Sequence, residues 1–126
     1  MDQWSTFLPW LKERLQQPLP GYEAQRRMMN INRPDTRETP PHARLSGVLV
    51  LLYPDGGDLK IVVIERSADG GVHSGQIALP GGKKEDTDET IVDTALREAA
   101  EEVALNAHKV EVIGRLSSLY IPVSNF

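Results

Sequence analysis

Segments of amphipathic and of continuously apolar sequence predict the elements of the first half of the chain. Apolar side chains recur at spacings of four, three and four from Trp4 to Leu15. This pattern predicts an amphipathic helix over residues 2–17, docked on the core or on a partner chain. Two apolar runs follow at residues 43–53 and 60–66. The turn residues between them predict a hairpin, and their continuous apolarity predicts strands buried on both faces.

Sequence patterns in the second half of the chain predict two further strands and a helix. Residues 76–79 form a predicted strand that enters a Pro-Gly-Gly turn, and residues 109–116 form another by alternation. A helix is predicted over about residues 87–103. The first and last residues of Asp86–Glu89 have the spacing of a capping box, although either residue between them could also be the cap.

Length and composition narrow the class of protein. With 126 residues, 40% of them hydrophobic and 25% charged, the chain predicts one globular domain over residues 43–126, preceded by the helix and an irregular connector over residues 1–42. A net charge of −4 argues against a nucleic-acid partner. The chain has no cysteine, which excludes disulfides and thiolate chemistry. It shows no signal peptide and no membrane-spanning run, so a cytoplasmic protein without a membrane partner is expected.

An acidic cluster occupies the predicted helix at residues 97–103, REAAEEV. Glu98, Glu101 and Glu102 follow helical spacings of three and four, so their carboxylates project to one side. Like charges at this spacing cost roughly 0.2–0.5 kcal/mol per pair, and acidic residues late in a helix also oppose its macrodipole. The cluster is therefore either a solvated helix face or a site for a cation. Oxygen ligands favour Mg²⁺ or Mn²⁺, ions that commonly act on phosphates.

The loop before this helix supports the interpretation as a site. Pro80-Gly81-Gly82 would let the backbone pass close to a metal and offer a carbonyl oxygen as a further ligand. Glu89 lies eight residues before Arg97, about two helical turns back. Its carboxylate could anchor the guanidinium, which in turn would orient a glutamate.

The same residues resemble the Nudix box, G-x5-E-x7-R-E-U-x-E-E-x-G-U, in which U is a bulky apolar residue. The matching charged positions are Glu89, Arg97-Glu98 and Glu101-Glu102. Six residues rather than five separate Gly82 from Glu89, so either the loop carries one insertion or Asp88 takes the acidic role. Ala104 stands where the box has glycine. Neither departure removes a carboxylate of the cluster.

The residues upstream resemble the coenzyme A diphosphatase branch of that family, whose signature is L-L-T-x-R-S-x3-R-x3-G-x3-F-P-G-G. The matching residues are Arg66-Ser67, Gly75 and Pro80-Gly81-Gly82. Gly71 stands where the signature has its second arginine, and Leu79 where it has phenylalanine. The resemblance implies coenzyme A as the substrate. The two gaps favour the alternative, a hydrolase of ADP-ribose or of nucleoside triphosphates.

The family resemblance implies an α/β/α sandwich around a mixed sheet, and hydrolysis of a nucleoside diphosphate linked to another group. It implies that Mg²⁺ or Mn²⁺ is held by the Gly82 carbonyl and the carboxylates of Glu98, Glu101 and Glu102. Glu98 would be a ligand or the base that acts on water. Coenzyme A would give 3′,5′-ADP and 4′-phosphopantetheine. The other implied site residues are Arg97 in the catalytic group and Arg66, Ser67 and Lys83 as substrate-binding residues.

The family fold normally continues beyond the strand expected near residues 109–116 with more strands and a closing helix. The sequence ends at Phe126, so the expected domain lacks these C-terminal elements. The expected partner is a small nucleotide diphosphate, and a homodimer is compatible with the sequence. A non-catalytic, nucleotide-sensing binding module is the alternative from another functional class.

Overall fold

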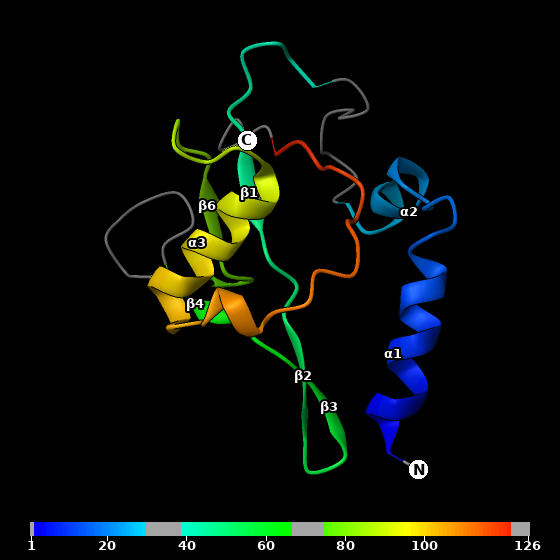
Figure 1. The fold of residues 1–126 in the computed structure, drawn as a ribbon. Helices are drawn as coiled ribbons and strands as arrows, with labels where there is room; N and C mark the ends of the chain where they lie inside the picture. Colours follow the sequence, from blue (N-terminus) through cyan, green and yellow to red (C-terminus); the bar gives the residue numbers. More distant parts are fainter. Residues whose placement is uncertain (1, 30–38, 67–74, 122–126) are drawn as a thin grey trace. The chain divides into compact units, whose positions relative to one another are not determined.

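A computed structural model of the chain describes residues 2–29, 39–66 and 75–121. The chain divides into two compact units (Figure 1): one is Arg44–Val110, and the other joins Met1–Ala43 with Glu111–Phe126. The predicted domain boundary after residue 42 stays a prediction. No helix in the described ranges is long and apolar enough to cross a bilayer.

The discontinuous unit begins with the predicted amphipathic helix, α1 (Gln3–Arg14). Asp2 caps it, because its Oδ1 atom accepts a hydrogen bond from the Ser5 backbone N–H at 2.7 Å. The prediction of a helix over residues 2–17 is therefore confirmed, with an earlier end. A second, shorter helix, α2 (Tyr22–Arg27), follows in the connector.

Residues 111–121 belong to the same unit and contact its first helix. The Lys12 ammonium lies 2.8 Å from the Glu111 carboxylate. The predicted strand over residues 109–116 is wrong: η1 (Ala107–Lys109) is a 3-10 helix, and no strand follows it through residue 121. An alternating pattern forms a strand only where a neighbouring strand shares its backbone hydrogen bonds. Among the described residues, none pairs with this segment.

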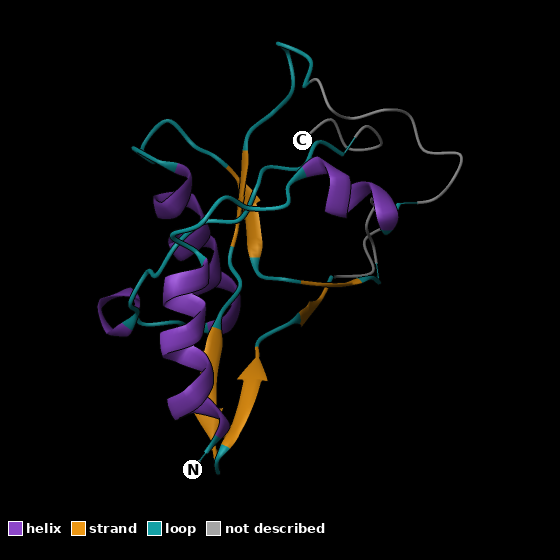
Figure 2. Cartoon of the chain, turned by 90° about the vertical axis from the view of Figure 1, so that its right-hand side faces the viewer, coloured by secondary structure: helices purple, strands orange, loops and turns teal. Residues whose placement is uncertain are grey.

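Short strands form antiparallel pairs in the unit Arg44–Val110. The pairs are β1 (Ser46–Val48) with β6 (Gly81–Lys83), β2 (Leu52–Asp55) with β3 (Asp58–Ile61), and β4 (Ile64–Glu65) with β5 (Ile77–Ala78). The predicted hairpin is confirmed: β2 and β3 join at Gly56 and Gly57, whose φ angles of 59° and 88° suit a tight turn. Figure 2 shows these strands as short segments separated by loops.

The helix α3 (Ile91–Val103) covers the β1–β6 pair (Figure 1). Gly47 on β1 permits this close approach, because a Cβ atom there would lie 2.6 Å from the Ile91 carbonyl oxygen and 2.9 Å from the Thr94 Cβ. Ala95 and Ala99 are buried at the same interface. Small residues on both sides thus let the helix lie almost against the strand backbone.

Thr90 caps α3, and Asp93 completes a capping box. The Thr90 hydroxyl accepts a hydrogen bond from the Asp93 N–H at 3.3 Å, and the Asp93 carboxylate accepts one from the Thr90 N–H at 3.0 Å. The predicted start near residue 87 and the predicted cap within Asp86–Glu89 are therefore wrong. Those residues form a turn before the helix.

The prediction that the apolar strands are buried on both faces is also wrong. Val48, Val50, Ile61 and Val63 are each 41–54% exposed. The β2–β3 hairpin pairs with no other described strand and extends away from α3 (Figure 1). The described part is thus a mixed α/β unit with short strands. The complete α/β/α sandwich stays a prediction.

Candidate active site

Asp88 lies buried in the turn between β6 and α3. Its carboxylate accepts hydrogen bonds from the Glu85 backbone N–H at 2.9 Å and from the Thr94 hydroxyl at 3.0 Å. Asp88 is 6% exposed, and Thr94 is fully buried. These contacts fix the turn to the first part of the helix.

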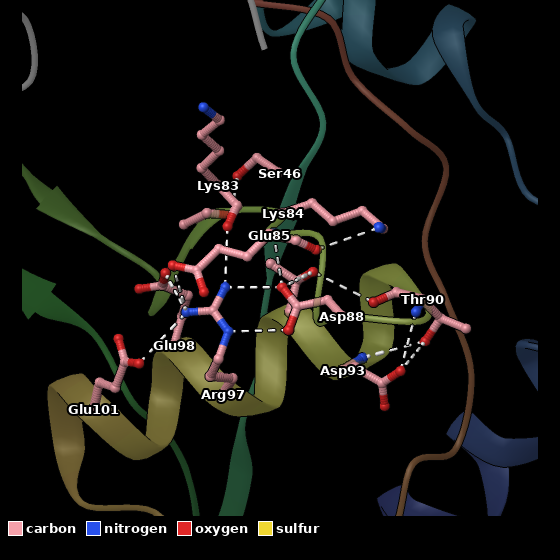
Figure 3. A network of polar contacts seen from close by, with 12 residues as sticks. Ser46, Lys83, Lys84, Glu85, Asp88, Thr90, Asp93, Arg97, Glu98 and Glu101 are labelled. Carbon is pink, nitrogen blue, oxygen red and sulfur yellow. Dashed lines mark hydrogen bonds and ion pairs between the residues drawn. The ribbon is translucent and has the colours of Figure 1, made fainter.

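Arg97 donates all of its N–H groups to protein oxygens (Figure 3). Nε and Nη2 bind the two oxygens of Asp88 at 3.0 and 2.9 Å, a bidentate pair. Nη2 also donates to the Lys83 carbonyl at 3.1 Å. Nη1 donates to Glu98 at 3.0 Å and to Glu101 at 3.4 Å. A guanidinium has five N–H donors, so each of them has an acceptor here.

The charge pair shifts the pKa values of both partners. The hydrogen bonds from the Arg97 guanidinium, followed by the one from the Glu85 backbone, hold the pKa of the Asp88 carboxyl well below its ordinary value. The same contact with Asp88 raises the pKa of Arg97 further. Both groups are therefore charged at neutral pH, and the pair is strongest in that state.

The anchor of Arg97 is Asp88 and not Glu89. Glu89 is exposed, whereas both oxygens of Asp88 face the guanidinium. The spacing left two alternatives, an insertion before Glu89 or Asp88 in place of Glu89. The second is correct, because Asp88 follows Gly82 after five residues and is the carboxylate that binds Arg97. The Thr90-x-x-Asp93 capping signal could have located the helix start and thereby placed Asp88 in the turn. No comparable signal in the sequence marks the buried hydroxyl of Thr94.

The Glu98 carboxylate lies directly against the backbone of Gly82. A Cβ atom at residue 82 would lie 2.6 and 2.7 Å from the two carboxylate oxygens, so any side chain there would displace the Glu98 carboxylate. Glu98 is held from the other side by Arg97, and its side chain is 17% exposed. The Gly82 carbonyl accepts a hydrogen bond from the Ser46 hydroxyl at 2.9 Å. The predicted glycine and glutamate are thus brought together.

Glu102 lies beside Glu98 at the same end of the helix. The pKa of the Glu102 carboxyl is raised, first because the group loses part of its hydration and also because the negative charge of Glu98 is close. A hydrogen bond from the Gly81 backbone lowers this pKa in part. The positive charge of Arg66, at the end of β4, lowers the pKa of Glu102. Glu98 and Glu102 therefore lie together beside the Gly81-Gly82 backbone, and the charge of Arg66 acts on Glu102.

The remaining predicted residues are less enclosed. The Glu101 side chain is 60% exposed and touches Arg97, and the Lys83 side chain is exposed at the end of β6. Ser67 lies outside the described residues. In the part of the chain that the structure describes, no three His, Cys, Asp or Glu side chains lie close enough to hold a metal ion together. The ligand roles predicted for the three glutamates stay predictions.

Comparison with known proteins identifies the family of the chain. The family model for the NUDIX domain matches residues 43–126, more than half of the chain. The chain belongs to the Nudix hydrolase family. The turn, helix and acidic cluster described above all lie within the matched part of this Nudix chain.

Several relatives align with the Nudix part of the chain. "Uncharacterized Nudix hydrolase NudL" of Pectobacterium atrosepticum is 49% identical over 59 residues, which cover 47% of this chain and 31% of that protein. "Nudix hydrolase 15, mitochondrial" of Arabidopsis thaliana is 42% identical over 72 residues, 56% and 25% of the two chains. The NudL protein of Shigella flexneri serotype 5b is 41% identical over 86 residues, 67% and 43%. The chain thus spans less than half of the length of each of these relatives.

Proposed function

We propose that this Nudix protein is a Mg²⁺- or Mn²⁺-dependent hydrolase that cleaves the diphosphate linkage of a nucleotide derivative, with coenzyme A as its substrate. The observation that carries the proposal is the Glu98 carboxylate, held against Gly82 by Arg97 and next to a second carboxylate, Glu102. Such a concentration of negative charge is unfavourable alone and becomes favourable when a cation binds.

The residues present fit a hard divalent cation. Every candidate donor is an oxygen atom, the ligand type that hard divalent cations prefer, and the missing side chain at Gly82 lets the Glu98 carboxylate lie against the backbone. Glu98 and Glu102 would hold the ion with the Gly82 carbonyl, and Glu101 would join them only after turning away from Arg97. When bound, the ion supplies Lewis acidity that neutralises a diphosphate and acidifies water.

The side chains of this site divide into positioning and binding groups. Arg97 has all its donors on protein acceptors, so it positions Glu98 and does not bind substrate. The guanidinium binds Oε1 of Glu98, which leaves Oε2 to face the cation or to take a proton from the attacking water.

The substrate assignment rests on the coenzyme A signature that includes Arg66 and on the charge that Arg66 exerts on Glu102. The charge of Arg66 acts on Glu102, so a phosphate bound near the glutamates would lie within its field. Lys83 adds an exposed positive charge at the end of β6. Ser67 follows Arg66 in the coenzyme A signature. These groups suit the multiply charged phosphates of coenzyme A.

The proposal is tested by incubating the chain with coenzyme A and Mn²⁺ and separating the products. We expect 3′,5′-ADP and 4′-phosphopantetheine, and a loss of roughly 10²–10⁴-fold in kcat for Glu98→Gln, because the group that binds the ion or takes the proton is then neutral. Glu65→Gln, an exposed glutamate of β4, is the matched control and should retain activity.

Two other outcomes would count against the proposal in different ways. Preferential cleavage of ADP-ribose or of a nucleoside triphosphate would overturn coenzyme A as the substrate and leave the hydrolase intact. No cleavage of any of these compounds, by a folded chain saturated with Mn²⁺, would overturn the enzymatic function itself.

A further inference from the structure

We propose that Thr94 is a positioning residue, whose buried hydroxyl fixes Asp88 and thereby orients the Arg97 guanidinium that presents Glu98. The inference deepens the proposed function, on which it rests for its metal-binding readout. It concerns a residue whose side-chain hydroxyl binds Asp88 and not Glu98.

The Thr94 hydroxyl has two acceptors within reach and one hydrogen to give. The Asp88 Oδ2 atom lies at 3.0 Å and the Thr90 carbonyl oxygen at 3.3 Å. A threonine inside a helix commonly donates to the carbonyl four residues before it, and Thr90 offers that option. Hydrogen bonds to a charged acceptor are shorter and stronger, so Asp88 is the favoured acceptor.

This hydroxyl controls the orientation of the Asp88 carboxylate. In a bidentate pair the guanidinium and the carboxylate share a plane, so rotation of the Asp88 carboxylate rotates Arg97 with it. Thr94 lies one helical turn before Arg97 on the same helix and holds Oδ2 from the helix side. The fixed plane determines where Nη1 points, and Nη1 is the atom that binds Glu98.

Two substitutions of Thr94 change its hydroxyl and its methyl group one at a time. Thr94 is fully buried, and its Cβ atom packs closely on Gly47. A Cβ atom added to Gly47 would lie only 2.9 Å from the Cβ atom of Thr94. Thr94→Val keeps the shape and places a methyl group against the Asp88 carboxylate. Thr94→Ser keeps the hydroxyl and loses the methyl group. The two variants therefore separate hydrogen bonding from packing.

The test combines two measurements on the chain: solvent exchange of the Arg97 Nε–H by NMR, and the dissociation constant for Mn²⁺. For Thr94→Val we expect faster Nε–H exchange and Mn²⁺ affinity weaker by about 10-fold, the lower end of the effect of groups that orient metal ligands. Thr94→Ser should restore both values, although packing is lost and the melting temperature falls. Thr87→Val, at an exposed threonine of the same turn, should change neither.

Each contrary result has a definite meaning. Wild-type exchange and affinity in Thr94→Val, with only a lower melting temperature, would overturn the positioning role. Equal losses in Thr94→Ser and Thr94→Val would also overturn it, because packing would then be the cause. If the wild-type chain binds no Mn²⁺, the proposed function fails, whereas exchange at Arg97 still decides the role of Thr94.

Discussion

The two ends of α3 obey opposite rules. At its N-terminal end, Thr90 and Asp93 satisfy each other's backbone N–H groups, and Asp88 in the preceding turn binds both Arg97 and Thr94. These contacts are what helix stability alone would select, since they satisfy donors and pair opposite charges.

The C-terminal end of the same helix shows the opposite character. Its last turn contains no basic residue, and Glu101 and Glu102 face the negative end of the helix dipole. Ala104 follows in the left-handed region, with φ of 56°, where a glycine would be unstrained. By contrast, α1 carries Lys12 and Arg14 in its last turn, as the dipole favours.

The difference between the two ends indicates which part of α3 serves binding. A stretch that is unfavourable for stability is retained where an external ligand can reverse the balance, and here that ligand would be a cation. The N-terminal end then serves as the rigid frame, and the C-terminal end as the binding surface. Arg97 connects the two, because it binds Asp88 on one side and Glu98 on the other.

Among changes to the frame, the largest effect should come from Asp88→Asn. The neutral amide cannot balance the Arg97 charge or accept its bidentate hydrogen bonds. We expect Mn²⁺ affinity to fall by about 10–100-fold, as is typical when a group that orients a metal ligand is lost. Glu89→Gln is the matched control, and isothermal titration with Mn²⁺ measures both. Equal losses in the two variants would mean that Asp88 is not the specific anchor.

A smaller effect concerns the pH dependence of the same frame. The pKa of Asp88 lies well below its ordinary value of 3.8 in the folded chain, so the unfolded chain binds this proton more readily. The stability from Asp88 is therefore present above the unfolded pKa and is lost as the pH falls toward the folded one. Urea unfolding between about pH 3 and 6 should show a drop in wild-type stability below about pH 4 and a flatter profile for Asp88→Asn. Parallel profiles would contradict the assignment.

The smallest effect should come from relieving strain at the other end of α3. Ala104→Gly removes the Cβ that the left-handed conformation disfavours, and should raise the free energy of unfolding by about 1 kcal/mol. Ala100→Gly, at an exposed position inside the helix, should instead lower it by roughly 0.5–1 kcal/mol. Thermal and urea unfolding test the contrast, and a loss of stability in both variants would show that residue 104 carries no strain.

The acidic cluster and the glycine turn of this protein were easier to predict from the sequence than the contacts that hold them in place. The acidic spacing of residues 98–102 and the Pro-Gly-Gly turn predicted that the glutamates and Gly82 belong to one site, because helical periodicity fixes which glutamates share a face, and the structure brings Glu98 and Gly82 together. Asp88 was missed as the single anchor, since an aspartate before a helix can equally be a cap. The strand expected near residues 109–116 failed because pairing, which decides a strand, is not visible in one segment alone.

The most direct test of the central claim is a Mn²⁺ titration followed by electron paramagnetic resonance, which reports the free ion. We expect saturable binding by the wild-type chain and binding at least about 10-fold weaker in Glu102→Gln, because this change removes a carboxylate from the cation site. Glu111→Gln, which alters the contact with Lys12 instead, should titrate like the wild type. Identical titrations of wild type and Glu102→Gln would contradict the claim that the C-terminal end of α3 holds a divalent cation.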